Sequence, residues 1–239
     1  MFARYLHHLP RFATQIAYVC HPALVSLFES SFPDVTICTQ PDPQLGDFCL
    51  PIGSLPRVLL EVGAAPEPPK HFPYLQTSTE AGSSELQAEL NKLRESDRPL
   101  LAITWRGSQQ DQLAERSTGL EHLLRQIPPE ARHQKQIISL QKDPTPNEIK
   151  TMNAAGVLDF SPYMTDFNAT GIILKRTESL ISIDTAIVHL AGALGVPFQL
   201  LLNPGGDWKW GKAQASNHCS DRDQGIWYPN HLLTEINNN

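Results

Sequence analysis

Residues 178–203, ESLISIDTAIVHLAGALGVPFQLLLN, constrain the fold of this chain more than any other segment. An apolar run at 180–183 predicts a buried strand, and residues 186–194 then follow a helical pattern. Gly195 stands where a left-handed residue ends a helix, with a proline two positions later. A second apolar run at 198–202 completes a β-α-β unit. The segment therefore predicts a parallel α/β sheet.

The turn between the strand and the helix of this unit predicts an anion site. Asp184 and Thr185 are residue types that cap helix starts by accepting a bond from a free backbone N–H. Because Asp184 repels phosphate, we expect it to cap the helix and hold the loop. Thr185, His189 and the backbone amides, that of Ala186 included, are left to meet the ligand at the positive end of the helix dipole. Ordinary α/β packing, with a satisfied interior histidine, is the alternative.

The second half of the chain alternates strand and helix signals regularly. Apolar runs predict strands at 100–104, 136–140, 156–159, 179–183 and 198–202, with helices between them. Such alternation favours a parallel, doubly wound sheet with right-handed crossovers.

The first half shows shorter elements and much proline. Helical patterns at 2–12, 22–32 and 55–62 alternate with strand-like runs at 16–19 and 35–38. Residues 76–98 begin with Ser, Thr and Gly and then place leucines at helical spacing, and we interpret this stretch as the connection between two domains.

Composition excludes several classes of protein. The 239 residues have a net charge of −6, which argues against a general nucleic-acid binder. No apolar run approaches the length of a membrane span, and no secretory signal pattern opens the chain. The four cysteines form no C-x-x-C pair and no H-E-x-x-H occurs, so we expect reduced thiols, a cytoplasmic location and no metal site.

Polar residues follow the predicted strands, at the edge where ligands of such sheets bind. After 100–104, Arg106 offers a donor fork suited to phosphate and Gly107 lets the backbone approach a ligand; solvated surface charge is the alternative for Arg106. After 136–140, Gln141 is predicted to bond a base or ribose, or else to be a plain polar residue at a strand end.

The loop after 198–202 places two tryptophans and a lysine between glycines. Large aromatic residues on this loop, Trp208 among them, are predicted to stack on a sugar or a base, and Lys209 to bring positive charge toward a leaving diphosphate. A lid that excludes water and a structural plug that pins the loop are equally compatible with this composition.

Several strings resemble a known family. DTAIVHLAGALGVP, followed by LLNPGGDWKWG and WYP, is similar to the C-terminal half of family 9 glycosyltransferases, the heptosyltransferase-like enzymes, and nearest to the group fused to tetratricopeptide repeats. Further pieces agree in order, namely FARYLHHL, FCLPIGSLP, PYL, LAITWRGS, ISLQKD and TDFNAT.

This resemblance implies a GT-B-like α/β fold with two Rossmann-like domains facing a cleft. The expected domains are a partial, acceptor-side N-terminal domain at 1–76, a linker at 77–98 and a nucleotide-sugar-binding domain at 99–239. The implied activity is metal-independent transfer of a sugar from a nucleotide-diphosphate donor, which is a substrate and not a cofactor. The implied partners are a glycan or lipid-linked acceptor, as in lipopolysaccharide biosynthesis, a membrane surface touched peripherally, and a partner subunit or repeat domain.

The resemblance also implies roles for residues. The donor diphosphate would be bound by Asp184, Thr185, Ala186, His189, Arg106, Gly107 and Lys209, with Gln141, Asp207 and Trp208 at the nucleotide or sugar. The family's usual catalytic base lies in a Gly-Asp loop before the helix matched by FARYLHHL, and the sequence begins inside or just before that helix. The catalytic residue is therefore unknown, with Asp47 as a weak candidate, and a non-catalytic sugar-nucleotide-binding module is the alternative function.

Overall fold

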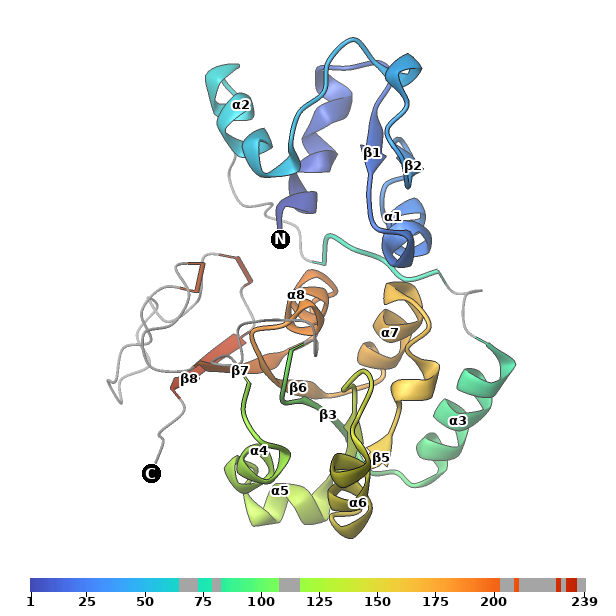
Figure 1. Ribbon diagram of the computed structural model, residues 1–239, viewed down its shortest axis with the longest axis vertical. Helices are drawn as coiled ribbons and strands as arrows, with labels where there is room; N and C mark the ends of the chain where they lie inside the picture. Colours follow the sequence, from blue (N-terminus) through green and yellow to red (C-terminus); the bar gives the residue numbers. More distant parts are fainter. Residues whose placement is uncertain are drawn as a thin grey trace.

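The computed structural model of this protein describes residues 1–64, 73–78, 83–107, 117–202, 209–210, 227–228 and 231–235. Their strands form two parallel sheets, one of two strands and one of six. Figure 1 shows the smaller sheet in an N-terminal unit, residues 1–64, and the larger one in a C-terminal unit that begins at residue 83. The mixed α/β fold with parallel sheets confirms the predicted fold class.

The six strands of the C-terminal unit are all parallel. They are β3 (Leu100–Thr104), β4 (Gln136–Ser139), β5 (Leu158–Asp159), β6 (Ser179–Ile183), β7 (Phe198–Leu202) and β8 (His231–Glu235). Their order, β5-β4-β3-β6-β7-β8, is the 3-2-1-4-5-6 order of doubly wound nucleotide-binding sheets. The sequence reading missed β8.

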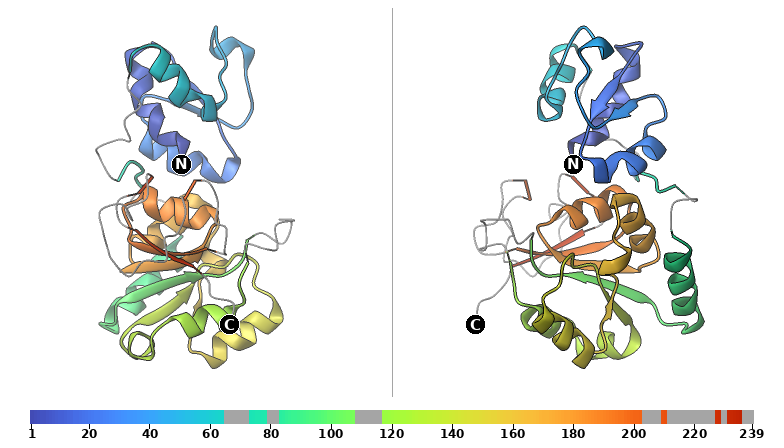
Figure 2. Two further views of the ribbon diagram at one scale, coloured as in Figure 1. Left: turned by 90° about the vertical axis from the view of Figure 1, so that its left-hand side faces the viewer. Right: turned by 45° about the vertical axis from the view of Figure 1, so that its right-hand side comes forward.

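Helices cover both faces of this sheet (Figures 1 and 2). On the face toward the N-terminal unit lie α7 (Phe167–Leu174) and α8 (Ala186–Ala193), and on the other lie α4 (Leu120–Gln126), α5 (Pro129–Gln134) and α6 (Pro146–Ala154). Helix α3 (Ser84–Glu95) lies to one side of the sheet. A short turn, η6 (Ser161–Tyr163), precedes α7. Alternate strand residues serve opposite faces: Leu180 belongs to the core cluster under α7 and α8, and Ile181 to the cluster under α4 and α6. Burial on both faces explains why these strands are continuous apolar runs.

The N-terminal unit is built from short elements. They are η1 (Phe2–Arg11), β1 (Ala17–Val19), η2 (Pro22–Leu24), α1 (Val25–Ser31), β2 (Thr36–Cys38), η3 (Pro43–Leu45), η4 (Ile52–Ser54) and α2 (Leu55–Glu61). β1 and β2 pair in parallel, with α1 between them in the chain. The expected first helix is a 3₁₀ helix with Pro10 inside it.

Residues 73–78, the connector, run between the two units in both figures. The backbone N–H groups of Tyr74 and Leu75 donate to the carbonyl of Ala193 at 3.0 and 3.2 Å. On the other side, the N–H of Gln76 donates to the hydroxyl of Ser31 at 2.9 Å. The connector is thus bonded to α8 and to α1, and one core cluster contains residues of both units.

The stretch expected to be a linker contains α3, whose Leu86 and Leu90 are buried in that shared core cluster. This helix is therefore part of the packed C-terminal unit, because the leucines on its apolar stripe are buried in the core. None of the helices that the structure describes is long and apolar enough to cross a membrane.

Candidate functional site

The strand order gives the six-stranded sheet a switch point between β3 and β6. The chain leaves β3 toward β4 on one side, and leaves β6 toward β7 on the other. Open α/β sheets hold their ligands at the carboxyl ends of the strands at such a point. The residues that follow these two strands are Trp105, Arg106 and Gly107 after β3, and Asp184 and Thr185 after β6.

Helix α8 begins immediately after β6. Thr185 is its N-cap residue, with an extended backbone at φ −134° and ψ 169°, but the threonine side chain makes no capping hydrogen bond. Its hydroxyl lies 3.3 Å from that of Ser182 instead. Asp184, the residue expected to cap the helix, therefore stands one position before the N-cap. Ala186, the first helical residue, is exposed.

Asp184 forms an ion pair with Lys209. The Lys209 ammonium lies 2.8 Å from Asp184 Oδ2, and the two side chains are only 16% and 6% exposed. An aspartate beside the start of a helix that is to receive phosphate would repel the ligand, and the lysine offsets that charge. The structure thus places Lys209 next to α8, although it follows a different strand.

His189 lies one turn into α8 among aromatic rings. Its imidazole stacks on Trp210, with ring centroids 5.0 Å apart and an interplanar angle of 10°. Its Nδ1 lies 3.0 Å from the Tyr228 hydroxyl, and its Nε2 lies 3.8 Å from Asp184 Oδ1. Burial, which the nearby Asp184 opposes, lowers the pKa of His189 to about 4, so the ring is neutral near pH 7.

Trp210 and Tyr228 were not among the predicted site residues. The clustering of tryptophans between 208 and 227 was the one signal that pointed toward them. Tyr228 packs so closely on α8 that a Cβ at Gly192 would stand 2.4 Å from its ring, so the tyrosine requires glycine at that position. The Trp227 indole N–H donates to the carbonyl of Lys209 at 2.7 Å, which joins these two parts of the chain.

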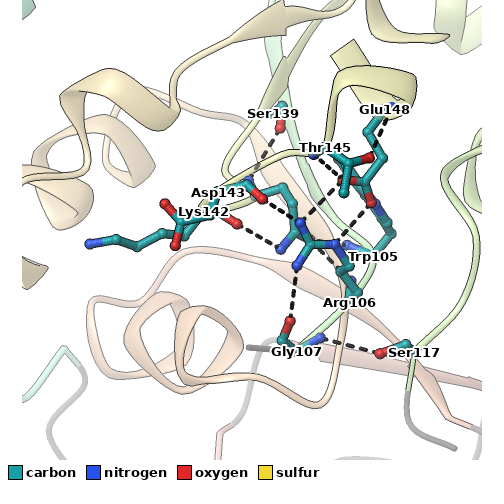
Figure 3. A network of polar contacts seen from close by, with 10 residues as sticks. Trp105, Arg106, Gly107, Ser117, Ser139, Lys142, Asp143, Thr145 and Glu148 are labelled. Atoms are coloured by element: carbon teal, nitrogen blue, oxygen red, sulfur yellow. Dashed lines mark hydrogen bonds and ion pairs between the residues drawn. The ribbon is translucent and has the colours of Figure 1, made fainter. Parts of the chain in front are cut away.

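The loop after β3 is held by a network around Glu148 (Figure 3). Arg106 donates from Nε and Nη2 to the two Glu148 oxygens at 2.9 and 3.1 Å, and the Trp105 indole N–H donates to Oε1 at 2.6 Å. Arg106 also donates to the carbonyl of Asp143. The Arg106 and Glu148 side chains are 14% and 16% exposed. The donor fork predicted for a phosphate therefore binds a carboxylate of α6 here.

Burial raises the pKa of Glu148, but hydrogen bonds from Arg106, the Thr145 backbone and Trp105 outweigh it and lower the pKa to about 2. Glu148 also completes a capping box with Thr145 at the start of α6. Sequence reasoning missed Glu148. The Thr-x-x-Glu spacing predicts the cap, but nothing in it points to Trp105 or Arg106.

Gln141, expected near a base or ribose, is buried and bonds the backbone of the same loop. Its Oε1 accepts from the N–H groups of Trp105 and Arg106 at 3.2 and 3.0 Å. The Gly107 N–H donates to Ser117 Oγ at 3.4 Å, and the Thr118 N–H donates to the carbonyl of Trp105 at 2.9 Å. Arg106 and Gln141 thus shape the loop in this structure, and contacts with a ligand stay a prediction for both.

Three predicted residues remain, namely Asp207, Trp208 and Asp47. Asp207 and Trp208 lie outside the described residues. Asp47 is exposed, on the loop between η3 and η4 of the N-terminal unit. Within the described part of the chain, no group of three or more His, Cys, Asp or Glu residues is arranged to hold a metal ion.

No family model matches the sequence, and no curated protein matches it. Solved structures do. A glycosyl transferase family 9 structure from Veillonella parvula aligns with 98% of this chain at a TM-score of 0.45 and 12% identity, and the chain spans 66% of that protein's length. The E. coli ADP-heptose lps heptosyltransferase II aligns with all of this chain and 87% of its own at a TM-score of 0.56 and 12% identity. The mixed α/β fold with parallel sheets therefore matches that of a GT-B-like glycosyltransferase.

Proposed function

We propose that this chain is a glycosyltransferase that binds a nucleotide-diphosphate sugar at the carboxyl ends of β3 and β6. The observation that carries the proposal is the strand order, because it brings the start of α8, with Lys209 and His189 beside it, to the switch point of the sheet. Backbone N–H groups and a helix dipole at that position attract a diphosphate. The likeness of fold to the E. coli heptosyltransferase supports the same activity class.

The proposed catalysis stabilises the negative charge that develops on the leaving diphosphate. When the bond between the anomeric carbon and the diphosphate oxygen breaks, that oxygen gains negative charge, which the α8 N–H groups and Lys209 would stabilise without a divalent metal. Lys209 has three donors, so it can keep Asp184 and still reach a phosphate oxygen. The acceptor hydroxyl forms the new bond to the anomeric carbon, and its proton passes to a base, for which Asp47 is the candidate.

In this proposal the loop after β3 offers its backbone N–H groups to the ligand, because the guanidinium of Arg106 is bonded to Glu148. Glu148 and Gln141 hold Arg106 and Trp105 from two sides, which fixes the path of the chain up to Gly107. The N–H of Gly107 would then meet the nucleotide from the β3 side while α8 meets the diphosphate from the β6 side. The acceptor, a glycan or lipid-linked sugar, would be held by the N-terminal unit, in a cytoplasmic enzyme at a membrane surface.

Calorimetric titration tests the donor site. The full chain is titrated with ADP, UDP and GDP and with the matching nucleosides; ADP is included because the name of the E. coli relative specifies ADP-heptose. Asp184→Asn combined with Lys209→Met removes the cation without leaving an unpaired carboxylate. Relative to Asp184→Asn alone, we expect the double variant to bind diphosphate about tenfold or more weakly, since a charge-assisted contact contributes about 1.5–3 kcal/mol, and to bind nucleoside equally well.

Lys92→Met is the matched control, because Lys92 pairs with Glu89 on the exposed face of α3. A double variant that binds diphosphate as tightly as Asp184→Asn alone would contradict the donor site. Equal losses for nucleoside and diphosphate would indicate a folding defect instead.

A second function, a non-catalytic sugar-nucleotide-binding module, is favoured by the exposed position of Asp47 on its loop. A transfer assay with a panel of nucleotide sugars and surface-glycan acceptors separates the two functions. Turnover that Asp47→Asn lowers by a factor of about 10²–10⁴ supports the enzyme with this base. Tight binding with no turnover supports the binding module.

A further inference from the structure

A cluster of buried polar and aromatic side chains links the N-terminal unit to His189. The His189 Nδ1 lies 3.0 Å from the Tyr228 hydroxyl, and Tyr74 of the connector and Arg4 of η1 interact with the same tyrosine. The Arg4 side chain is fully buried. Its guanidinium carbon lies 4.9 Å and 5.2 Å from the ring centroids of Tyr74 and Tyr228. We call Arg4, Tyr74, Tyr228 and His189 the relay.

The direction of the protons in the relay follows from what each group can donate. A guanidinium only donates, so Arg4 can act on a tyrosine oxygen only as a donor. If Tyr228 donates to His189 Nδ1, that nitrogen is an acceptor, and the proton of the neutral ring lies on Nε2.

The other side of the imidazole requires the same direction. Nε2 of His189 lies 3.8 Å from Asp184 Oδ1. A bare nitrogen lone pair facing a carboxylate is repelled, whereas an Nε2–H is attracted to it. The acceptor at Nδ1 and the carboxylate near Nε2 therefore select one tautomer. Because the ring is neutral near pH 7, the choice of tautomer decides whether the nitrogen toward the start of α8 is a donor or an acceptor.

We propose that Tyr228, held by Tyr74 and Arg4, is a positioning residue that locks His189 in the Nε2–H tautomer, so that the neutral imidazole donates a hydrogen bond at the anion site of α8. The ligand, an oxyanion of a nucleoside diphosphate, rests on the proposed function; the tautomer does not. Arg4 of the N-terminal unit thereby acts on the donor site through Tyr228, with its guanidinium 5.2 Å from the centroid of that ring.

The tautomer is measured first, in the ligand-free full chain. Nuclear magnetic resonance of protein labelled with ¹⁵N at histidine separates the two neutral tautomers by their ring nitrogen shifts, and His189→Gln identifies the signal among the nine histidines. We expect a single Nε2–H tautomer near pH 7. In Tyr228→Phe, which keeps the ring against Gly192, the Nδ1–H form should become populated.

The control is Tyr18→Phe, since Tyr18 is a partly buried tyrosine of β1 outside the relay, and it should leave the His189 signals unchanged. An Nδ1–H tautomer in the wild-type chain overturns the proposal. So does an unchanged, pure Nε2–H signal in Tyr228→Phe, because the hydroxyl would then have no positioning role.

The ligand arm uses ADP and adenosine as probes. We expect Tyr228→Phe to weaken ADP binding about three- to tenfold and to leave adenosine binding unchanged, because only the diphosphate meets Nε2. ADP affinity equal to wild type in Tyr228→Phe, with the tautomer changed, overturns the role of the imidazole as a donor. A locked Nε2–H tautomer in a chain that binds none of the nucleoside diphosphates contradicts the proposed function but leaves the tautomer assignment intact.

Discussion

Glu148 connects three parts of the C-terminal unit through one carboxylate. It accepts from the Trp105 indole, from the Arg106 guanidinium, and from the Thr145 N–H at the start of α6. Burial opposes the charge of Glu148, yet these donors hold its pKa at about 2, against an ordinary value of 4.5. The lowered pKa means that the ionised carboxylate is more stable in the folded state than in the unfolded state, so the ionised form stabilises the fold.

The shift of Glu148 predicts how stability depends on pH. Its contribution, on the order of 3 kcal/mol, is fully present above the unfolded pKa of 4.5 and is lost as the pH falls toward about 2. Glu148→Gln should therefore lower the free energy of unfolding by about 2–3 kcal/mol near pH 7, and the difference from wild type should shrink below pH 4.5. Urea unfolding at neutral and at acidic pH measures both values.

The matched control is Glu178→Gln, because Glu178 pairs with Lys135 at 3.0 Å but is 53% exposed. An exposed pair contributes about 0–1 kcal/mol, so this variant should have little effect. A Glu148→Gln effect no larger than that of Glu178→Gln would show that the network around Arg106 does not stabilise the fold.

Helix α8 combines the site with close packing of its own backbone. Gly195 after it has φ +76°, which confirms the predicted left-handed residue at the end of this helix. Gly192 has a different reason to be glycine, because the rigid ring of Tyr228 lies where a Cβ would stand. Tyr228 in turn reaches His189 on the same helix. Gly192 and His189 of α8 thus both contact Tyr228, the first through its backbone and the second through its imidazole.

Gly192→Ala should therefore move Tyr228 away from α8. Overpacking of this kind typically costs about 1–3 kcal/mol, and we expect a loss of stability in that range together with a changed His189 environment. Thermal unfolding gives the first quantity and the histidine resonances give the second. Gly53→Ala is the control, since a Cβ at Gly53 would meet nothing within 4 Å. If both variants had the same stability, the contact between Tyr228 and α8 would be absent in solution.

At the scale of the whole molecule, the two units share one core. Leu27 of α1 and Val188 of α8 belong to the same cluster of buried residues, and the connector is hydrogen-bonded to both helices. Arg4 of η1 adds a further link, because it donates to the carbonyl of Trp227 at 2.6 Å. Relative motion of the two units would break these contacts. We therefore expect the chain to unfold as one cooperative unit.

Cooperativity can be tested because the four tryptophans, at 105, 208, 210 and 227, all follow the connector. Tryptophan fluorescence reports on the C-terminal unit, whereas far-ultraviolet circular dichroism reports on both units. The two denaturation curves should coincide. Leu27→Ala, in the core of the N-terminal unit, should destabilise the chain by about 2–5 kcal/mol and shift the fluorescence midpoint as well.

Leu60→Ala is the control in the same unit, because Leu60 is largely exposed, and it should shift neither curve. Two separate transitions, or a fluorescence midpoint that Leu27→Ala does not move, would show that the units unfold independently.

The sequence by itself determined the elements of the doubly wound sheet. The predicted bounds of the strands at 100–104, 179–183 and 198–202 are those of β3, β6 and β7. Strands buried on both faces are apolar throughout, and polar residues and glycine mark their ends. The bounds of such strands can therefore be predicted from neighbouring residues in the sequence. The strand β8 was not predicted, because its buried residue is a histidine, His231, and its Leu232 is exposed, so the segment does not read as a buried apolar run. Its position in the sheet depends on pairing with β7.

Only the tertiary structure decided which side chains meet. Arg106 and Glu148 are 42 positions apart, and Arg4 and Trp227 are 223 apart, so no local pattern carries these contacts. Asp184, whose repulsion of phosphate was expected from its type, is paired with Lys209. The strand order brings distant loops to one edge of the sheet, and side chains gathered there choose partners by charge, burial and donor geometry. Residue types and their spacing along the chain therefore do not predict which side chains form these contacts.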